Sequence, residues 1–143
     1  GSSGPAMIGT LALPKMHLPL TQSKTRFTFN RKLFEEKLMK GEKVETCRGD
    51  WKPSTLNTLM ERCRVRQMVK AMGNWGLDTH FAWVELLSVS EPQPIMNVLG
   101  VNTTERLRRL GMGGSDVQTY INLWCGGAKE KYVSHINFKI HKI

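Results

Sequence analysis

The sequence has few cysteines and no long apolar run. Three cysteines among 143 residues, Cys47, Cys63 and Cys125, are too few for a disulfide framework and too scattered for a zinc site built of cysteines alone. The apolar runs are far shorter than the roughly 20 residues that a membrane-spanning helix requires. No stretch combines the basic start and long apolar core of a signal peptide. We therefore expect an intracellular protein with reduced thiols, neither secreted nor inserted in a membrane.

The composition is that of a folded chain with a short N-terminal arm. Hydrophobic residues make up 40% and charged residues 23%, which is typical of a globular protein. We interpret residues 1–7 as a tag remnant, residues 8–25 as an extended arm and residues 26–143 as one globular domain. Pro14 and Pro19 disfavour a helix in the arm. Its apolar side chains must dock on their own domain or on a neighbouring copy. We predict a self-association arm that uses Leu11, Leu13, Leu18 and Leu20.

The net charge of +9 at pH 7 is unevenly spread. Residues 1–76 carry 14 Lys and Arg against six Asp and Glu, whereas residues 77–143 carry seven against six. This imbalance favours one basic face, which would attract nucleic acid or anionic lipid headgroups. The alternative is that the cations only keep the domain soluble. We predict that the polyanion-binding face comprises Lys37, Lys40, Lys43, Arg48, Lys52, Arg62, Arg64, Arg66 and Lys70, with a secondary basic surface at Arg106, Arg108 and Arg109.

Hydrophobic periodicity predicts several short elements before the C-terminal region. Residues 26–30 and 42–48 are expected to form strands, and residues 31–40 fit a helix or a strand. Residues 79–90 are apolar on both faces, which is typical of a central strand covered on both sides. A short helix is expected at residues 105–110, before a glycine-rich turn.

The clearest predicted helix runs from Ser54 to Met72, with Ser54 as its N-cap and Gly73 just after its end. Its apolar residues fall on one face in the first half and on roughly the opposite face after Arg64. Either the two ends of the helix are buried on different sides, or the helix breaks near Arg64.

Two segments near the C-terminus alternate between apolar and polar residues. They are residues 117–124 and 135–141, and the glycine-containing turn 126–130 lies between them. Two such runs around a short turn predict a β-hairpin. The chain as a whole is therefore expected to form a single α+β domain, with a mainly antiparallel sheet, one main helix and a C-terminal β-hairpin.

No set of residues with catalytic spacing is found. His135 and His141 share a strand face, but at six residues apart they would stand about 20 Å from each other, too far to share a metal ion. Cys63 falls on the apolar side of the predicted helix, where an inert thiol is expected. We therefore predict that the protein is not an enzyme and uses neither a cofactor nor a metal.

The order of the elements resembles the globular core of a known family. A basic strand leads into Asp50-Trp51-Lys52-Pro53-Ser54, and the main helix ends in Met72-Gly73-Asn74-Trp75-Gly76 before the apolar strand 81–89. Further along, Glu105-Arg106-Leu107-Arg108-Arg109 precedes a glycine turn. Over about residues 25–143, this arrangement resembles matrix proteins of the rhabdovirus type. The resemblance implies a structural protein that condenses the nucleocapsid, self-associates and contacts anionic membrane. The Pro-Pro-x-Tyr and Pro-Thr/Ser-Ala-Pro budding motifs of animal-virus members are absent, so budding by those routes is not expected.

We accordingly expect a viral structural protein of matrix type. Its expected partners are other copies of itself, the nucleocapsid or RNA, and an anionic membrane surface, without a small-molecule substrate. A viral protein of this kind is expected in the host cytoplasm or nucleus and in the virion. Two alternatives remain open: a small basic RNA-binding module, such as a viral silencing suppressor, and a protein-interaction adaptor with an incidental basic surface.

Overall fold

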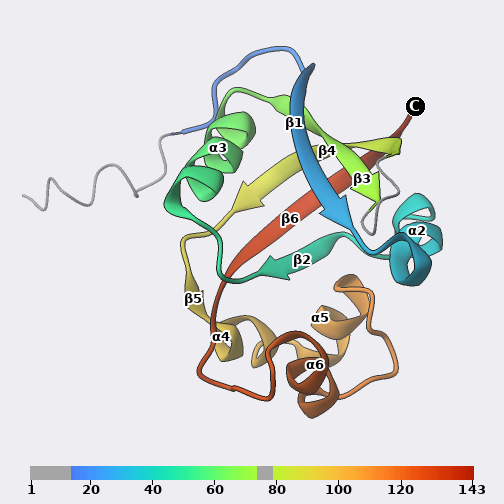
Figure 1. Cartoon of the computed structure of the whole chain (residues 1–143), viewed down its shortest axis with the longest axis vertical. Coiled ribbons are helices and arrows are strands. Elements are labelled where there is room, and N and C mark those ends of the chain that lie inside the picture. The colour runs from blue at the N-terminus through green and yellow to red at the C-terminus, as the bar shows by residue number, and fades with distance from the viewer. Residues whose placement is uncertain (1–13, 74–78) are drawn as a thin grey trace, which may run out of the picture.

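A computed structural model describes residues 14–73 and 79–143 of the chain (Figure 1). Five strands form one mixed sheet in the order β1-β3-β4-β6-β2, and the short strand β5 pairs separately with β6. Among the strand pairs of the described residues, β1 and β3 run parallel and the others are antiparallel. The predicted α+β fold with a mainly antiparallel sheet is thus confirmed. The strands are β1 (Thr21–Phe29), β2 (Glu45–Arg48), β3 (Gln67–Gly73), β4 (His80–Val89), β5 (Gln93–Pro94) and β6 (Tyr132–Lys142).

The helices pack in two groups. The helices α2 (Arg31–Met39) and α3 (Pro53–Arg64) contribute to the core on one face of the sheet. The helices α4 (Ile95–Leu99), α5 (Thr103–Arg109) and α6 (Val117–Trp124) gather near β2 and the start of β6 (Figure 1). The ambiguous segment 31–40 is helical because the Asn30 side chain caps it, accepting a hydrogen bond from the Leu33 amide.

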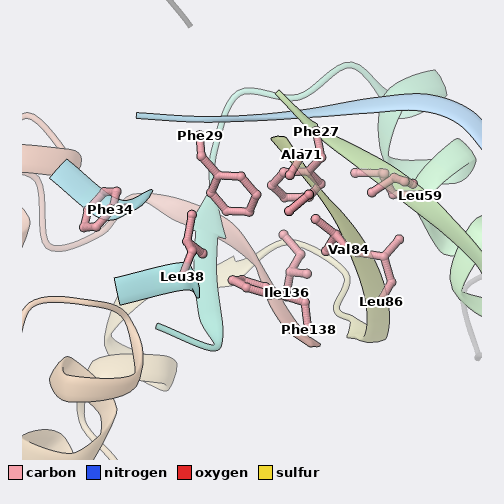
Figure 2. Packing of buried hydrophobic residues seen from close by; sticks show 12 residues of the cluster. Phe27, Phe29, Phe34, Leu38, Leu59, Ala71, Val84, Leu86, Ile136 and Phe138 are labelled. Carbon is pink, nitrogen blue, oxygen red and sulfur yellow. The ribbon is translucent and has the colours of Figure 1, made fainter. Parts of the chain in front are cut away.

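The main core lies between the sheet and the helices α2 and α3 (Figure 2). Every second residue of the central strands points into it, as the two-residue period of a strand requires. Leu38 and Leu59 pack onto these residues from the two helices. The other buried members are Phe27, Phe29, Phe34, Val69, Ala71, Ala82, Val84, Leu86, Ile136 and Phe138. A second cluster, built around Ile95, Leu99 and Ile121, joins α4, α5 and α6 to the first half of β6.

The predicted helix from Ser54 to Met72 is wrong in its second half. The helix α3 ends at Arg64, and after a turn in which Arg66 takes a φ of 60° the chain continues as strand β3. The change of apolar face near Arg64 marks this break. β3 lies between β1 and β4, and Val69 and Met72 are both buried although they point to opposite faces. Because β3 carries buried apolar residues on both faces, these residues do not alternate with polar ones, and periodicity alone does not distinguish such a segment from a helix.

The predicted C-terminal β-hairpin is also wrong. Residues 117–124 form helix α6, and only the second segment is a strand, β6. The side chain of Asp116 accepts a hydrogen bond from the Thr119 amide at 2.7 Å and caps the helix. Tyr120 and Ile121 are buried, and with Val117 they lie at the i, i+3 and i+4 positions of one helical face. The same residues fit both periods, and the cap decides in favour of the helix.

The described part of the N-terminal arm contacts its own domain. Residues 21–25, which the sequence assigned to the arm, belong to β1. The Met16 amide donates to the carbonyl of Arg64 at 2.9 Å, and Lys15 Nζ donates to the carbonyl of Leu86 at 3.3 Å. Leu18 is exposed and Leu20 is partly buried, whereas Leu11, Leu13 and the expected tag at 1–7 lie outside the described residues. Among the helices that the structure describes, none has the length and hydropathy to cross a membrane.

Candidate polyanion-binding site

The nine predicted cations do not lie on one face. The Thr21 amide at the start of β1 donates to the carbonyl of Arg66, so the end of α3 lies beside the start of that strand. The helix α2, which carries Lys37 and Lys40, follows the other end of β1 after nine strand residues. A strand of this length spans roughly 25 Å. The cations of α2 are therefore far from those that follow α3, and Figure 1 shows the two helices on different sides of β1.

The three arginines at residues 62–66 are engaged within the domain. Arg62 donates to Thr25 Oγ1 at 3.0 Å and to Gln67 Oε1 at 2.7 Å. Arg64 forms an ion pair with Glu61 at 2.8 Å, and Arg66 lies 3.7 Å from Glu85. Two of the three charges thus have a carboxylate partner that the sequence analysis did not assign.

The other predicted cations are in different environments. Lys43 is only 4% exposed, so its predicted place on a surface is wrong. Arg48 is partly buried beneath β1. Lys37 donates to the carbonyl of Gly111 at 2.8 Å, and Lys40 is exposed, 3.7 Å from Glu36. Of the last two, Lys52 at the start of α3 is exposed and Lys70 on β3 is partly exposed.

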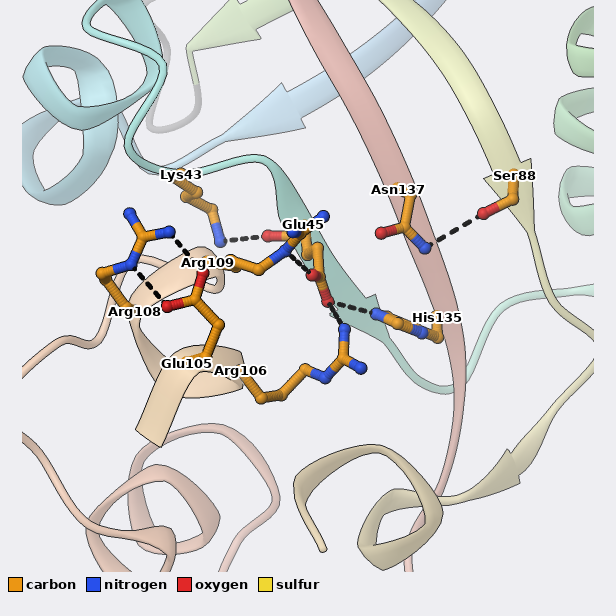
Figure 3. Close-up of polar contacts among 9 residues, drawn as sticks. All are labelled: Lys43, Glu45, Ser88, Glu105, Arg106, Arg108, Arg109, His135 and Asn137. Carbon is orange, nitrogen blue, oxygen red and sulfur yellow. Dashed lines mark hydrogen bonds and ion pairs between the residues drawn. The ribbon is translucent and has the colours of Figure 1, made fainter. Parts of the chain in front are cut away.

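Two of the three arginines of the secondary basic surface bind a buried carboxylate (Figure 3). Glu45 on β2 is fully buried, and Arg106 Nη1 donates to it at 2.5 Å. Arg109 donates to the other carboxylate oxygen, and His135 Nε2 lies 2.6 Å from the first. Arg108 instead pairs with the exposed Glu105. Arg106 and Arg109 therefore hold α5 against β2, a role that sequence spacing did not indicate.

The electrostatics of Glu45 follow from these contacts. Burial alone raises the pKa of a carboxyl group, because it disfavours the charged form. Hydrogen bonds to His135, Arg106 and Arg109 act in the opposite direction and outweigh burial, so that the pKa of Glu45 is lowered to about 2. Glu45 is thus a buried charge that is compensated by the partly exposed Arg106 and Arg109 and by His135.

A row of polar side chains crosses the sheet on the face opposite the main core. Arg26 on β1 is in register with Lys70 on β3, Lys70 with Trp83 on β4, and Trp83 with His141 on β6. Directly opposite residues of neighbouring strands point to the same face of a sheet. Their neighbours in sequence, such as Val84, point into the core. We call these four residues the cross-strand row.

Cations outnumber carboxylates around this row. Lys139 lies on the same face two residues before His141, and it is in register with Glu85. The carboxylate of Glu85 lies at hydrogen-bonding distance, 2.9 Å, from His141 Nε2. Its other oxygen lies 3.7 Å from the Arg66 guanidinium. Arg26, Arg66, Lys70 and Lys139 thus place four cations beside one carboxylate among the residues that the structure describes on this face.

The aromatic member of the row is held in place. The His80 ring meets the Trp83 ring edge to face, with 4.4 Å between the centroids. Trp83 itself is partly buried. The helices α4, α5 and α6 gather at the other end of the sheet, near β2 (Figure 1). The row therefore combines one oriented aromatic ring with flanking cations on a sheet surface.

A second feature is a set of adjoining hollows around Arg48. Three pockets, of about 400, 260 and 460 Å³, are all lined by this residue. The largest also contains Lys43, Lys131 and Trp124 on its walls. Sequence analysis singled out Lys43 and Arg48 as cations but had no means of placing Lys131 and Trp124 beside them, because these four come from separate elements.

No protein-family model, curated protein or solved structure matches this chain. The case for a function therefore rests on the geometry of the chain itself.

Proposed function

We propose that this protein binds single-stranded RNA across the outer face of its sheet, with the cross-strand row as the contact surface. The observation that carries the proposal is the register of Arg26, Lys70, Trp83 and His141 over four neighbouring strands. The proposal keeps RNA as the expected partner and moves the contact surface away from Arg62 and Arg64, which are engaged within the domain.

The chemistry of the row suits a single strand. A base that is not paired in a duplex exposes a flat π-face, and an aromatic ring on a sheet can stack against it. Lys70 and Lys139 flank Trp83 on the adjacent strands, at positions where they would meet the phosphates on either side of a stacked base. A duplex would instead hide its base faces, so Trp83 would contribute little to binding it.

The rhabdovirus-type matrix function stays a prediction from the sequence. It shares RNA as a partner with this proposal and adds self-association and contact with anionic membrane. The described contacts of Met16 and Lys15 join this part of the arm to its own domain, and RNA binding at the cross-strand row requires no second copy.

A binding assay with matched variants tests the proposal. A fluorescently labelled single-stranded RNA, the corresponding duplex, and vesicles of phosphatidylserine and phosphatidylcholine are titrated with the wild-type protein. Trp83→Leu is expected to weaken single-strand binding by at least about fivefold, since stacking of one base contributes about 1–3 kcal/mol. Leu123→Ala is the control, because Leu123 is an exposed apolar residue of α6 away from the row.

The outcomes separate the two functions. Preference for the single strand, together with a loss that is specific to Trp83→Leu, supports the proposal. Binding to the anionic vesicles without binding to RNA would contradict it and favour the membrane contact of the matrix prediction. Equal affinity of wild type and Trp83→Leu for RNA would remove the cross-strand row from the site.

A further inference from the structure

Two buried or partly buried cations, Lys43 and Arg48, lie together without an ion pair. Lys43 Nζ donates to the backbone carbonyls of Glu45, at 2.9 Å, and Leu110, at 2.5 Å. Arg48 donates to the carbonyl of Thr28 at 2.8 Å and to Thr46 Oγ1 at 3.2 Å. All four acceptors are neutral, and no carboxylate in the described part of the chain lies within ion-pair distance of either cation.

Burying two cations without an opposite charge is energetically costly for the domain. Removing a cation from water is unfavourable unless an opposite charge or strong hydrogen bonds compensate it. The nearby carboxylate of Glu45 is already bound by Arg106 and Arg109. An arginine has five N–H donors, and hydrogen bonds to the described residues come only from Nε and Nη2 of Arg48. The site thus has both positive charge and donors to spare for an anion.

The hollow beside these cations has the size of a ligand site. The pocket of about 460 Å³ lies within the range typical of small-molecule sites. Lys131 adds a third cation to its wall, held at 2.8 Å from Asp50. Trp124, which is 39% exposed, adds an aromatic surface and is braced by the Phe34 ring, with 5.9 Å between the centroids.

We propose that this pocket binds a nucleoside phosphate, with the phosphate near Arg48, Lys43 and Lys131 and the base against Trp124. Arginine matches phosphate through paired N–H donors. A site with two or three cations also matches the double charge of a phosphate dianion better than the single charge of a carboxylate ligand. An exposed tryptophan face provides the stacking surface that a base requires. The ligand can be a free mononucleotide or the phosphorylated 5′ end of a strand, since both present the same chemistry. The site is separate from the cross-strand row and does not depend on it.

The state of Lys43 gives a signature of binding that requires no mutation. Burial lowers the pKa of Lys43 to about 7, and the charge of Arg48 acts in the same direction. The other charged groups that act on it are Glu45, which raises its pKa, and Lys37, which lowers it. The nearby thiol of Cys47 is neutral at this pH, because burial raises its own pKa to about 12. A phosphate dianion placed beside Lys43 would raise its pKa again. At pH 8, where phosphate monoesters are already dianions, binding should therefore take up as much as about one proton.

Isothermal titration with adenosine 5′-monophosphate tests the proposal, with adenosine as the probe that lacks the phosphate. We expect the monophosphate to bind and adenosine not to bind, with proton uptake at pH 8 measured in buffers of different ionisation enthalpy. Asp50→Asn should tighten binding several-fold because it removes the carboxylate that holds Lys131, and Asp50 has a φ of 61°, which asparagine tolerates. Lys131→Gln should weaken binding, whereas Lys129→Gln, an exposed position outside the pocket, should not.

These variants avoid Arg48, whose loss could unfold the domain. Tighter binding by Asp50→Asn and weaker binding by Lys131→Gln, each with unchanged thermal stability, would support the site. Equal binding of adenosine and its monophosphate would overturn the phosphate assignment, and no binding of the monophosphate at millimolar concentration would overturn the proposal. Competition by 5′-phosphorylated but not 5′-hydroxyl RNA would identify a strand end as the source, while competition by neither would identify a free nucleotide. Trp83→Leu should leave monophosphate binding unchanged, so failure of this site and failure of the RNA-binding proposal can be told apart.

Discussion

Arg48 Nη2 on β2 donates to the carbonyl oxygen of Thr28 on β1, across 2.8 Å. These two strands are the ends of the strand order, so the bond joins the two open edges of the sheet. The guanidinium also lies 4.4 Å from the centroid of the Phe27 ring and 5.4 Å from that of Phe29. One side chain therefore bridges the sheet edges and covers two core aromatics, which also protects the edges from pairing with other chains.

Arg48→Gln should lower the free energy of unfolding by about 1.5–3 kcal/mol, the range for hydrogen bonds that involve a charged group. The change is measured as a shift in the midpoint of urea denaturation, with the dependence of the unfolding free energy on urea concentration unchanged. Lys52→Gln is the matched control, because Lys52 is exposed at the start of α3. An Arg48→Gln protein as stable as the Lys52→Gln control would mean that the two edges need no bridge.

Stability should fall in acid because of Glu45. Its pKa in the folded protein is about 2, below the ordinary value of 4.5. The contribution of Glu45 is therefore fully present above pH 4.5 and is lost as the pH falls toward 2. Two and a half pKa units correspond to about 3 kcal/mol. Denaturant titrations at a series of pH values across this window measure the loss.

Glu45→Gln should remove most of that acid dependence and cost about 1.5–3 kcal/mol at neutral pH, since it removes the charge-assisted hydrogen bonds of Arg106 and Arg109. Glu105→Gln is the control, because that carboxylate pairs with Arg108 on the surface and contributes little. The account of the buried cluster fails if the two variants show the same stability and the same pH profile.

Leu59→Ala should cost about 2–5 kcal/mol, as expected for a filled core position. Leu59 is 3% exposed and packs from α3 onto the sheet. Leu33→Ala on the exposed face of α2 should change stability by less than about half a kcal/mol. If Leu59→Ala loses as little stability as Leu33→Ala, then Leu59 does not lie on the face of α3 that packs against the sheet.

The sequence predicted the elements whose pattern is purely local. β4, β6, the helix α3 and the buried position of Leu59 follow from periodicity and composition. The second half of the predicted helix failed because this segment pairs with β1 and β4 as strand β3, and periodicity within the segment cannot show such long-range pairing. α6 failed because alternation and helical spacing coincide over eight residues, and only the Asp116 cap separates them.

The candidate sites were less predictable than the fold. Counting charges along the chain found Lys70 but could not pair Arg64 with Glu61 or bury Glu45 beneath Arg106. The cross-strand row depends on the register of four strands, and no spacing in the sequence encodes that register. Trp83 lies within residues 79–90, for which the sequence predicts a central strand and no binding role.

Changing Arg62, Arg64 and Arg66 together to Glu is expected to destabilise the domain. The new carboxylates would lie beside Glu61 and Glu85, which now pair with two of these arginines. Like charges at such positions repel, and the hydrogen bonds of Arg62 to Thr25 and Gln67 would be lost. Thermal melting of the triple variant measures the effect, and a melting temperature equal to that of wild type would contradict it. Loss of RNA binding in this variant would not locate the binding surface.

The most direct test of the RNA-binding proposal is the salt dependence of single-strand binding in Lys70→Gln. Each phosphate contact contributes about 0.7 to the slope of log K against log salt concentration. Because Lys70 lies in the cross-strand row, Lys70→Gln should reduce this slope by about 0.7 relative to wild type. Lys40→Gln removes a cation from the exposed surface of α2 and should leave the slope unchanged. A slope that falls in Lys40→Gln and not in Lys70→Gln would place the bound strand elsewhere and contradict the account.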